Sequence, residues 1–137
     1  MSVVVGAVIV REGRVLAARR TRPAELAGQW EFPGGKVEAG EEVPAALVRE
    51  IEEELSSTID VLDEVVDHDG LWRIGDKHVL RLFLATVRSG EPVAGSDHDA
   101  LRWLPVSDLG RVNWLPSDQQ ALPFVQQAVA RLLAQLD

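Results

Sequence analysis

The amino-acid sequence predicts one domain of the α/β (α+β) class, in which helices cover a mixed β-sheet. Residues 3–10 are a short, continuous, β-branched apolar run, which indicates a buried strand. Other strand-like segments fill most of the chain, and amphipathic helical patterns occur at residues 44–55 and 123–136. That order of elements is typical of a sheet layered with helices. The chain shows neither an internal repeat nor a linker, so we expect a single domain over residues 1–137.

The remaining strands are predicted from short apolar runs between turn signals. Residues 15–18 follow a turn at residues 11–13, so they are expected to form a hairpin with the first strand. Further strands are expected at residues 58–66, 77–87 and 100–104, and one helical turn at residues 107–109.

A Pro-Gly-Gly stretch at residues 33–35 follows a loop at residues 21–28 and a short extended piece at residues 30–32. Glycine adopts positive φ without steric cost and lets the backbone approach a neighbour closely. We therefore expect a turn at this point, beside a group that needs close contact.

Each helix is predicted from one apolar stripe and one proline. Pro44 suits the first turn of the first helix. Pro123 marks either the start of the second helix or a break after an initial turn. The two stripes recur at helical spacing: Leu47, Val48, Ile51 and Leu55 in the first helix, and Val125, Val129, Leu132, Leu133 and Leu136 in the second.

Composition excludes several classes of function. The net charge is −8 and the pI is near 4.8, which argues against a nucleic-acid partner, because such surfaces are basic. No apolar run approaches the roughly 20 residues that span a bilayer, and nothing resembles a signal peptide. The chain has no cysteine, which excludes disulfides and thiolate metal sites and predicts a cytoplasmic setting. A phosphorylated ligand of so acidic a protein would need a divalent cation as a bridge.

Residues 34–57 concentrate seven glutamates against two basic residues. Glu50, Glu53 and Glu54 stand at i, i+3 and i+4, so on a helix they project to one side. Converging carboxylates suit Mg²⁺, and the carbonyl of the preceding glycine stretch could add a backbone ligand. Arg49 could brace one carboxylate through a bidentate hydrogen bond. The alternative is a solvated acidic helix face, which is what most charge runs are.

The spacing of this segment resembles the signature of the Nudix hydrolase family, G-x5-E-x7-R-E-U-x-E-E-x-G-U with U aliphatic. The matching positions are Gly35, Glu41, Arg49, Glu50, Ile51, Glu53 and Glu54. The final glycine of the signature falls on Ser56 and its last aliphatic position on Ser57. That glycine would act as a left-handed helix cap, so the serine puts the helix end in doubt but removes no carboxylate.

The resemblance implies a Nudix α/β/α sandwich with a mixed β-sheet, and roles for particular residues. Glu50, Glu53 and Glu54 would bind Mg²⁺, with Mn²⁺ as a substitute, and Glu53 or Glu54 would activate water. Arg49 and Glu41 would orient this cluster. Further metal ligands would be the Gly35 carbonyl and Asp97, which lies six residues before Trp103 as in MutT-like relatives. Asp99 is the alternative candidate. Asp97 could also be an ordinary polar loop residue without a role in metal binding.

Residues 26–41, LAGQWEFPGGKVEAGE, resemble the MutT-like branch of the family and, within it, the bacterial CTP pyrophosphohydrolase type. This resemblance implies nucleotide contacts. Arg20 and His78 occupy positions that face the nucleotide. Apart from the resemblance, Phe83 and Trp114 are candidate pocket walls, with a core role as the alternative. Asp118 occupies the base-pocket position, where an ionised carboxylate accepts a hydrogen bond from the cytosine N4 amino group. A surface role for Arg20 and a helix N-cap role for Asp118 are the structural alternatives. His68 and His98 are left unassigned.

The function implied is Mg²⁺-dependent hydrolysis of a nucleoside triphosphate to the monophosphate and pyrophosphate, favouring CTP, dCTP or 5-methyl-dCTP. Three alternatives keep the same fold: a MutT-type enzyme that removes 8-oxo-dGTP, a hydrolase of ADP-ribose or a related diphosphate, and a non-catalytic nucleotide-binding domain. The expected partner is a small nucleotide, with no nucleic acid or membrane, and the protein would be a monomer or a homodimer. The sequence does not fix the base, the number of metal ions or the residue that activates water.

Overall fold

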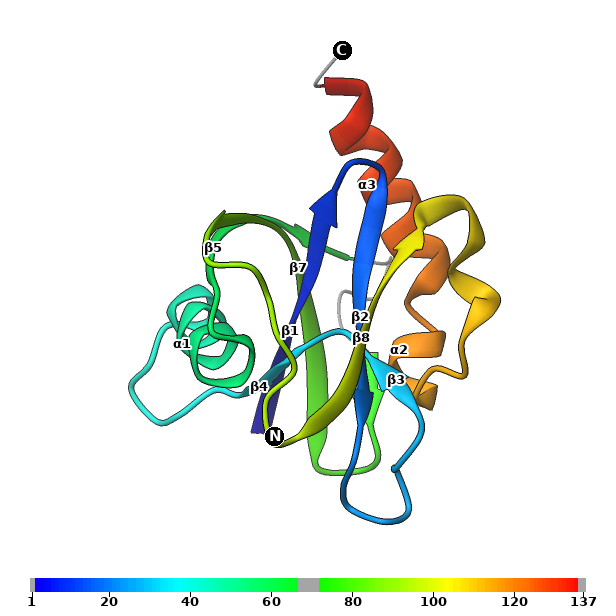
Figure 1. The fold of residues 1–137 in the computed structure, drawn as a ribbon. Coiled ribbons are helices and arrows are strands. Elements are labelled where there is room, and N and C mark those ends of the chain that lie inside the picture. Colours follow the sequence, from blue (N-terminus) through cyan, green and yellow to red (C-terminus); the bar gives the residue numbers. More distant parts are fainter. Residues whose placement is uncertain (1, 67–71, 136–137) are drawn as a thin grey trace.

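The computed structural model describes residues 2–66 and 72–135, which form a mixed β-sheet between two helical layers (Figure 1). The strands are β1 (Ser2–Arg11), β2 (Arg14–Arg20), β3 (Trp30–Glu31), β4 (Gly34–Lys36), β5 (Thr58–Val65), β6 (Trp72–Ile74), β7 (His78–Ser89) and β8 (His98–Pro105). The helices are α1 (Val43–Leu55), a 3₁₀ segment η1 (Val106–Arg111), α2 (Pro116–Gln119) and α3 (Leu122–Gln135).

The sheet is mixed, as predicted. Its central path runs β3-β2-β1-β7-β5, with β4 also pairing β1, β6 pairing β7 and β8 pairing β2. The long β1–β7 pair is parallel, and the other pairs between named strands are antiparallel. The sequence prediction of a mixed sheet in an α/β (α+β) fold is confirmed.

The strands β1 and β2 separate soon after their hairpin. They pair only at Val10–Val15 and Arg11–Arg14, beside the turn. Beyond that point β4 pairs with the first half of β1, while β2 pairs with β8 and β3. The sheet therefore opens between β1 and β2, and the chain from β3 to β4 crosses this opening.

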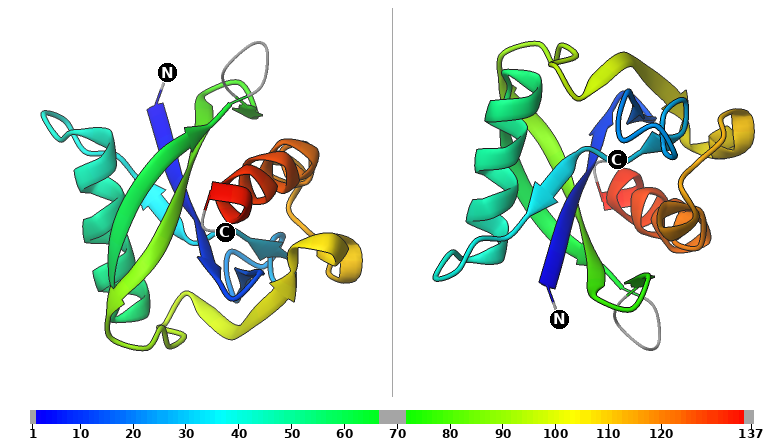
Figure 2. Two further views of the ribbon diagram at one scale, coloured as in Figure 1. Left: turned by 90° about the horizontal axis from the view of Figure 1, so that it is seen from above. Right: turned by 90° about the horizontal axis from the view of Figure 1, so that it is seen from below.

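Each face of the sheet carries its own apolar core, and α1 and α3 lie on opposite sides (Figure 2). The predicted stripe of α1 is buried at Leu47, Ile51 and Leu55, with Val48 half-buried. On the other side α3 buries Val125 and Val129. Because burial of apolar side chains drives this packing, the acidic side of α1 is left facing outward.

The glycines of residues 33–35 do not form the predicted positive-φ turn. Gly34 and Gly35 begin the short strand β4, and neither has positive φ. The expected close approach is present: a Cβ at Gly34 would overlap the Val5 carbonyl oxygen, and one at Gly35 would overlap the Glu50 carboxyl group. Glycine is needed here for contact distance and not for backbone conformation.

The end of α1 accommodates both departures from the Nudix signature. Ser56 has φ 55° and ψ 36°, the left-handed conformation that glycine usually supplies, and its N–H donates to the Glu52 carbonyl. The Ser57 side chain is buried, and its hydroxyl donates to the Gly90 carbonyl at 2.7 Å. The helix therefore ends where the signature ends it, with a polar contact at the position that is aliphatic in the signature.

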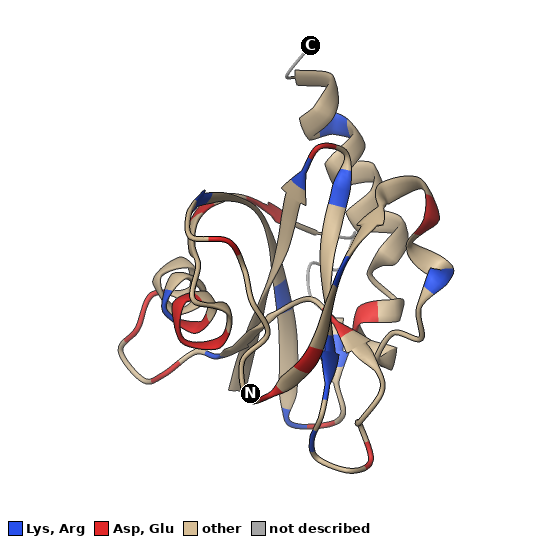
Figure 3. Ribbon diagram, viewed as in Figure 1, with Lys and Arg blue, Asp and Glu red and all other residues tan. Residues whose placement is uncertain are grey.

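Acidic residues gather on α1 and on the loop that precedes it (Figure 3). In the described part of the chain, no helix is both long and apolar enough to cross a membrane.

Candidate active site

Arg49 is the centre of the acidic face of α1. Its guanidinium donates two hydrogen bonds to Glu41, at 2.7 and 3.0 Å, and one each to Glu50 at 3.1 Å and Glu53 at 3.2 Å. A further bond reaches the Lys36 carbonyl at 3.2 Å, which ties α1 to β4. The guanidinium lowers the pKa of Glu41 to about 2. From the sequence we expected Arg49 and Glu41 to orient the glutamate cluster, and these contacts are suited to that role.

Glu50 lies against β4. Its carboxylate packs where a side chain on Gly35 would be, so the glycine brings the strand and the acid into contact. Burial raises the pKa of Glu50, and the Arg49 guanidinium opposes that rise. Glu53, one helical turn on, is 59% exposed, so α1 presents one shielded and one open carboxylate.

Glu54 and Asp97 meet although 43 residues separate them in the chain. Burial, followed by a hydrogen bond with Asp97, raises the pKa of Glu54 to about 7. The pKa of Asp97 is lowered, chiefly by hydrogen bonds from Arg22, the nearer at 2.5 Å. Asp99, the alternative candidate, is exposed and pairs with Arg19 at 2.6 Å. The structure therefore brings Asp97, and not Asp99, to the glutamate cluster.

A cavity of about 190 Å³ opens where β1 and β2 separate, and we call it the Asp118 cavity. Arg20, Glu31, Gly35 and Asp118 contribute to its wall. The apolar part of the lining is Val4, Val5, Leu26, Phe32, Ile74, Leu80 and Leu115. A second, outer chamber of about 440 Å³ shares Leu26, Ile74, Leu115 and Ser117 with it, so the two form one cleft. A cleft with few converging polar groups is the usual form of a small-molecule site.

Asp118 is 4% exposed and accepts a hydrogen bond from the Phe32 N–H at 3.1 Å. Burial, and then the negative charge of Glu31, raise its pKa from 3.8 to about 7. It lies within α2 and not at a helix N-cap, since Leu115 occupies that position. The capping alternative is therefore wrong.

Arg20 is held at the cavity by two partners. Its guanidinium donates to both Glu31 oxygens, at 3.0 and 3.2 Å, and its Nε donates to the Arg22 carbonyl at 3.0 Å. The arginine is half-buried and not a free surface cation. Its place in the cavity wall fits the predicted contact with nucleotide.

Two substrate-binding predictions on β7 are not matched by the cavity. Phe83 packs in the core beneath α1, with Ala7, Leu47 and Ile51, and is not part of the cavity wall. Side chains alternate along a strand, and the cavity lies on the face of Leu80, so Phe83 points to the other face of the sheet, away from this cavity. His78 shares the face of Leu80, but it does not line the cavity either.

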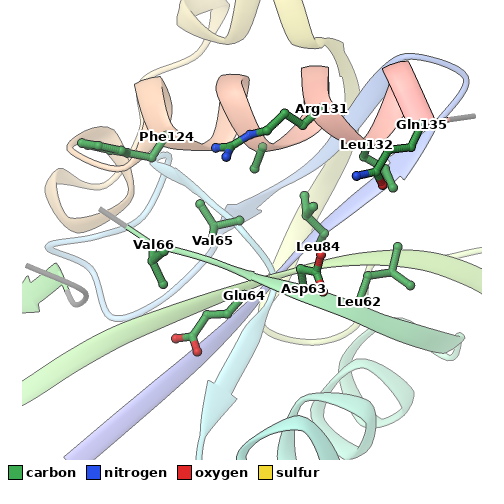
Figure 4. Close-up of a pocket in the computed structure, with 11 residues that line it drawn as sticks. Leu62, Asp63, Glu64, Val65, Val66, Leu84, Phe124, Arg131, Leu132 and Gln135 are labelled. Atoms are coloured by element: carbon green, nitrogen blue, oxygen red, sulfur yellow. The ribbon is translucent and has the colours of Figure 1, made fainter. Parts of the chain in front are cut away.

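Another cavity, of about 260 Å³, lies between β5 and α3, and we call it the β5–α3 cavity (Figure 4). None of the predicted site residues lines it. Its lining comes from β5, β7, α3 and the residue after β5: Leu62, Asp63, Glu64, Val65, Val66, Leu84, Phe124, Ala128, Arg131, Leu132 and Gln135.

The carboxylates form a donor set suited to a hard divalent cation. Within residues 2–66 and 72–135, no three acidic or histidine side chains are arranged so that they could hold an ion. Nevertheless, Glu54 and Asp97 are two acids in hydrogen-bonding contact, a crowding that a cation between oxygen ligands relieves. The absence of a side chain at Gly35 also lets the backbone of β4 lie against the Glu50 carboxylate. By the chemistry of their oxygen donors, these residues fit a magnesium-type site.

Two residues were missed by sequence reasoning, Glu31 and His98. Glu31 lines the Asp118 cavity, and the Nε2 atom of His98 lies 2.8 Å from a carboxylate oxygen of Glu31. Neither stands in a spacing that suggests chemistry, and 67 residues separate them. The only available signal was that His98 follows Asp97. His68 lies outside the described residues.

A mixed sheet between two helical layers, with a braced carboxylate cluster beside a largely apolar cleft that has a few polar groups, is the architecture of an α/β/α sandwich hydrolase. The chain belongs to the Nudix family: the NUDIX domain model matches residues 2–127. It is therefore a Nudix hydrolase of the nucleoside triphosphate pyrophosphatase type, and the family expected from the sequence is confirmed.

Two similar proteins carry names with different substrates. A Mycobacterium tuberculosis protein named "Putative 8-oxo-dGTP diphosphatase 2" is 45% identical over 123 residues, covering 85% of this chain and 82% of that protein. The CTP pyrophosphohydrolase of Escherichia coli strain K12 is 34% identical over 137 residues, covering 93% and 90%. Among solved structures, a MutT NUDIX hydrolase from Burkholderia pseudomallei has a TM-score of 0.78 and 37% identity, covering 90% and 97%.

Proposed function

We propose that this nucleotide pyrophosphohydrolase acts with Mg²⁺ on nucleoside triphosphates, giving the monophosphate and pyrophosphate, and favours cytosine nucleotides. The observation that carries the proposal is the position of Gly35. This residue both lines the Asp118 cavity and lies against the Glu50 carboxylate. A nucleotide whose base enters the cavity therefore has a route that leads its phosphates toward the acidic helix.

In this proposal Glu50, Glu53, Glu54 and the Gly35 carbonyl hold Mg²⁺, with Asp97 contributing from the opposite side. The cation, when bound, offsets phosphate charge and lowers the pKa of water. The Glu53 carboxylate is 59% exposed and contacts Arg49 at 3.2 Å; in this proposal it accepts a proton from a water molecule. Arg49 and Glu41 keep the cluster in place, and Arg20 offers its guanidinium to the nucleotide.

Cytosine preference rests on Asp118. When ionised, its carboxylate only accepts hydrogen bonds, which suits the N4 amino group of cytosine. A pKa of about 7 means that the neutral acid is also populated near neutral pH, and that form donates as well as accepts. This observation, together with the 45% identical relative, favours 8-oxo-dGTP as the second candidate.

The proposed partner is a small nucleotide alone, bound by a protein that is a monomer or homodimer. A cytoplasmic location and a single domain over residues 1–137 belong to the same proposal. The absence of cysteine supports the location, and the family match over residues 2–127 supports the domain.

The test is pyrophosphate release with Mg²⁺, and separately with Mn²⁺, across CTP, dCTP, 5-methyl-dCTP, 8-oxo-dGTP, dGTP, ATP and ADP-ribose. We expect the highest kcat/KM with a cytosine nucleotide, and a kcat about 10²- to 10⁴-fold lower in Glu53→Gln. Glu52→Gln is the matched control, because Glu52 is exposed on the same helix and its carboxylate contacts Thr58.

Highest turnover of 8-oxo-dGTP would keep the enzyme class and reject cytosine preference. Unchanged activity in Glu53→Gln would reject the assignment of the glutamates.

A further inference from the structure

His98 lies between a carboxylate of the Asp118 cavity and a carboxylate of the acidic helix. Its Nε2 is 2.8 Å from a Glu31 oxygen, and its Nδ1 is 3.5 Å from a Glu54 oxygen. The His98 side chain is 1% exposed. One buried ring therefore touches both halves of the site, which come from β3 and α1.

The surroundings of His98 are not those of an ordinary core histidine. Its Nδ1 is buried without a hydrogen-bond partner, although it faces Glu54. A buried polar atom left unpaired costs folding free energy, so its presence calls for an explanation. A slight movement of Glu54 toward the ring would bring its carboxyl group within hydrogen-bonding distance of Nδ1.

The backbone aims His98 at this point. His98 begins β8 and stands opposite Arg20, where the pairing of β2 and β8 shifts register. Such irregularities re-aim side chains, and they are frequent beside active sites. On one side the ring contacts Glu31, which pairs with Arg20; on the other it faces Glu54, which contacts Asp97.

We propose that His98 is a positioning residue that sets the nucleotide-binding side of the cleft against the acidic helix, holding Glu31 through Nε2 and Glu54 through Nδ1. The proposal rests on the proposed site but not on the identity of the base. Residues that hold a ligating carboxylate from behind commonly control metal affinity and turnover. His98 acts in this way on Glu54, and on the other side it orients Glu31, a carboxylate of the Asp118 cavity.

Two conservative substitutions separate the two contacts. A glutamine places its amide near the position of Nε2, so His98→Gln keeps the Glu31 contact and loses the one with Glu54. An asparagine places its amide near the position of Nδ1, so His98→Asn keeps the Glu54 contact and loses the one with Glu31. His98→Ala removes both.

The readouts are kcat and KM with the triphosphate that the wild type hydrolyses best, and the affinity for Mn²⁺ alone, measured from the electron paramagnetic resonance of the free ion. We expect His98→Gln to lower kcat and Mn²⁺ affinity about 10-fold each with KM unchanged. For His98→Asn we expect KM to rise about 10-fold, with kcat and Mn²⁺ affinity close to wild type. His98→Ala should show both changes.

Val129→Ala controls for lost stability, because Val129 is fully buried in the core beneath α3. It should lower the unfolding temperature without altering kcat, KM or Mn²⁺ affinity. The proposal is overturned if the Gln and Asn variants change the same parameters, or if both stay within about twofold of wild type. Because the best wild-type substrate is used, failure of the cytosine assignment would leave this test intact.

Discussion

The Asp118 cavity and the β5–α3 cavity differ in what they bury, although the second is the larger, at about 260 Å³ against about 190 Å³. In the β5–α3 cavity, Asp63 and Arg131 are exposed and keep their charges in water. In the Asp118 cavity the carboxyl of Asp118 is withdrawn from solvent, near a second acid, Glu31. Burying an ionisable group costs free energy, so such groups mark functional sites better than volume does.

Among the changes that test this comparison of cavities, the largest effect is expected from breaking the contact between the Asp118 cavity and α1. Gly35→Ala places a methyl group in the space of the Glu50 carboxylate, so either β4 or Glu50 must move. We expect pyrophosphate release to fall about 100-fold, because ligand carboxylates tolerate little displacement. Gly110→Ala is the matched control, since a Cβ there meets no atom within 4 Å. Equal activity in the two variants would contradict the inference that the contact between Gly35 and Glu50 is needed for catalysis.

Asp118→Asn sharpens the comparison by changing what the cavity recognises. An amide donates and accepts, whereas the ionised carboxylate only accepts, so above pH 7 the ratio of kcat/KM for CTP over 8-oxo-dGTP should fall about 10- to 100-fold. Asp108→Asn, at an exposed carboxylate outside both cavities, should leave the ratio unchanged. A constant ratio in Asp118→Asn would remove this residue from base recognition.

The pH dependence of stability follows from the burial of Asp118, whose pKa rises from 3.8 to about 7 in the folded protein. Because the folded pKa of Asp118 is raised, its stabilising contribution is fully present below its unfolded pKa of 3.8. That contribution is lost as pH rises through about 7. Glu54, with its raised pKa, acts in the same direction, so the comparison must be with a variant.

The difference in unfolding free energy between the wild type and Asp118→Asn isolates the contribution of Asp118 ionisation. As pH rises from 4 to 8, the wild type should lose on the order of 4 kcal/mol of unfolding free energy relative to Asp118→Asn. Urea denaturation without added metal measures it. A difference that does not change with pH would mean that Asp118 ionises as freely in the folded state as in the unfolded one.

The smallest effect is expected at the β5–α3 cavity. Leu132 lines it and is half-buried, so Leu132→Ala should lower the free energy of unfolding by about 1–2 kcal/mol. Thermal unfolding measures this loss, and kcat/KM should equal the wild-type value. A change in kcat/KM would show that the two cavities are coupled through the sheet.

The sequence predicted the elements whose signal is local. The helix at residues 44–55 carries its own apolar stripe and proline, and the long strands carry continuous apolar runs. The short strands β4 and β6 were missed, because segments of three residues are defined by the partners they pair with. Gly34 and Gly35 were expected in a turn for the same reason, since their strand β4 is defined only by its pairing with β1.

By itself, the sequence determined the carboxylate cluster, because residues four apart on a helix share a face wherever the helix lies. That covers Arg49, Glu50, Glu53 and Glu54. Only the tertiary structure decided which face of β7 meets the cleft, and so excluded Phe83 from the cavity wall. It also brought His98 between Glu31 and Glu54, because hydrogen bonding and burial between distant segments depend on how strands pair and diverge, which no local pattern encodes.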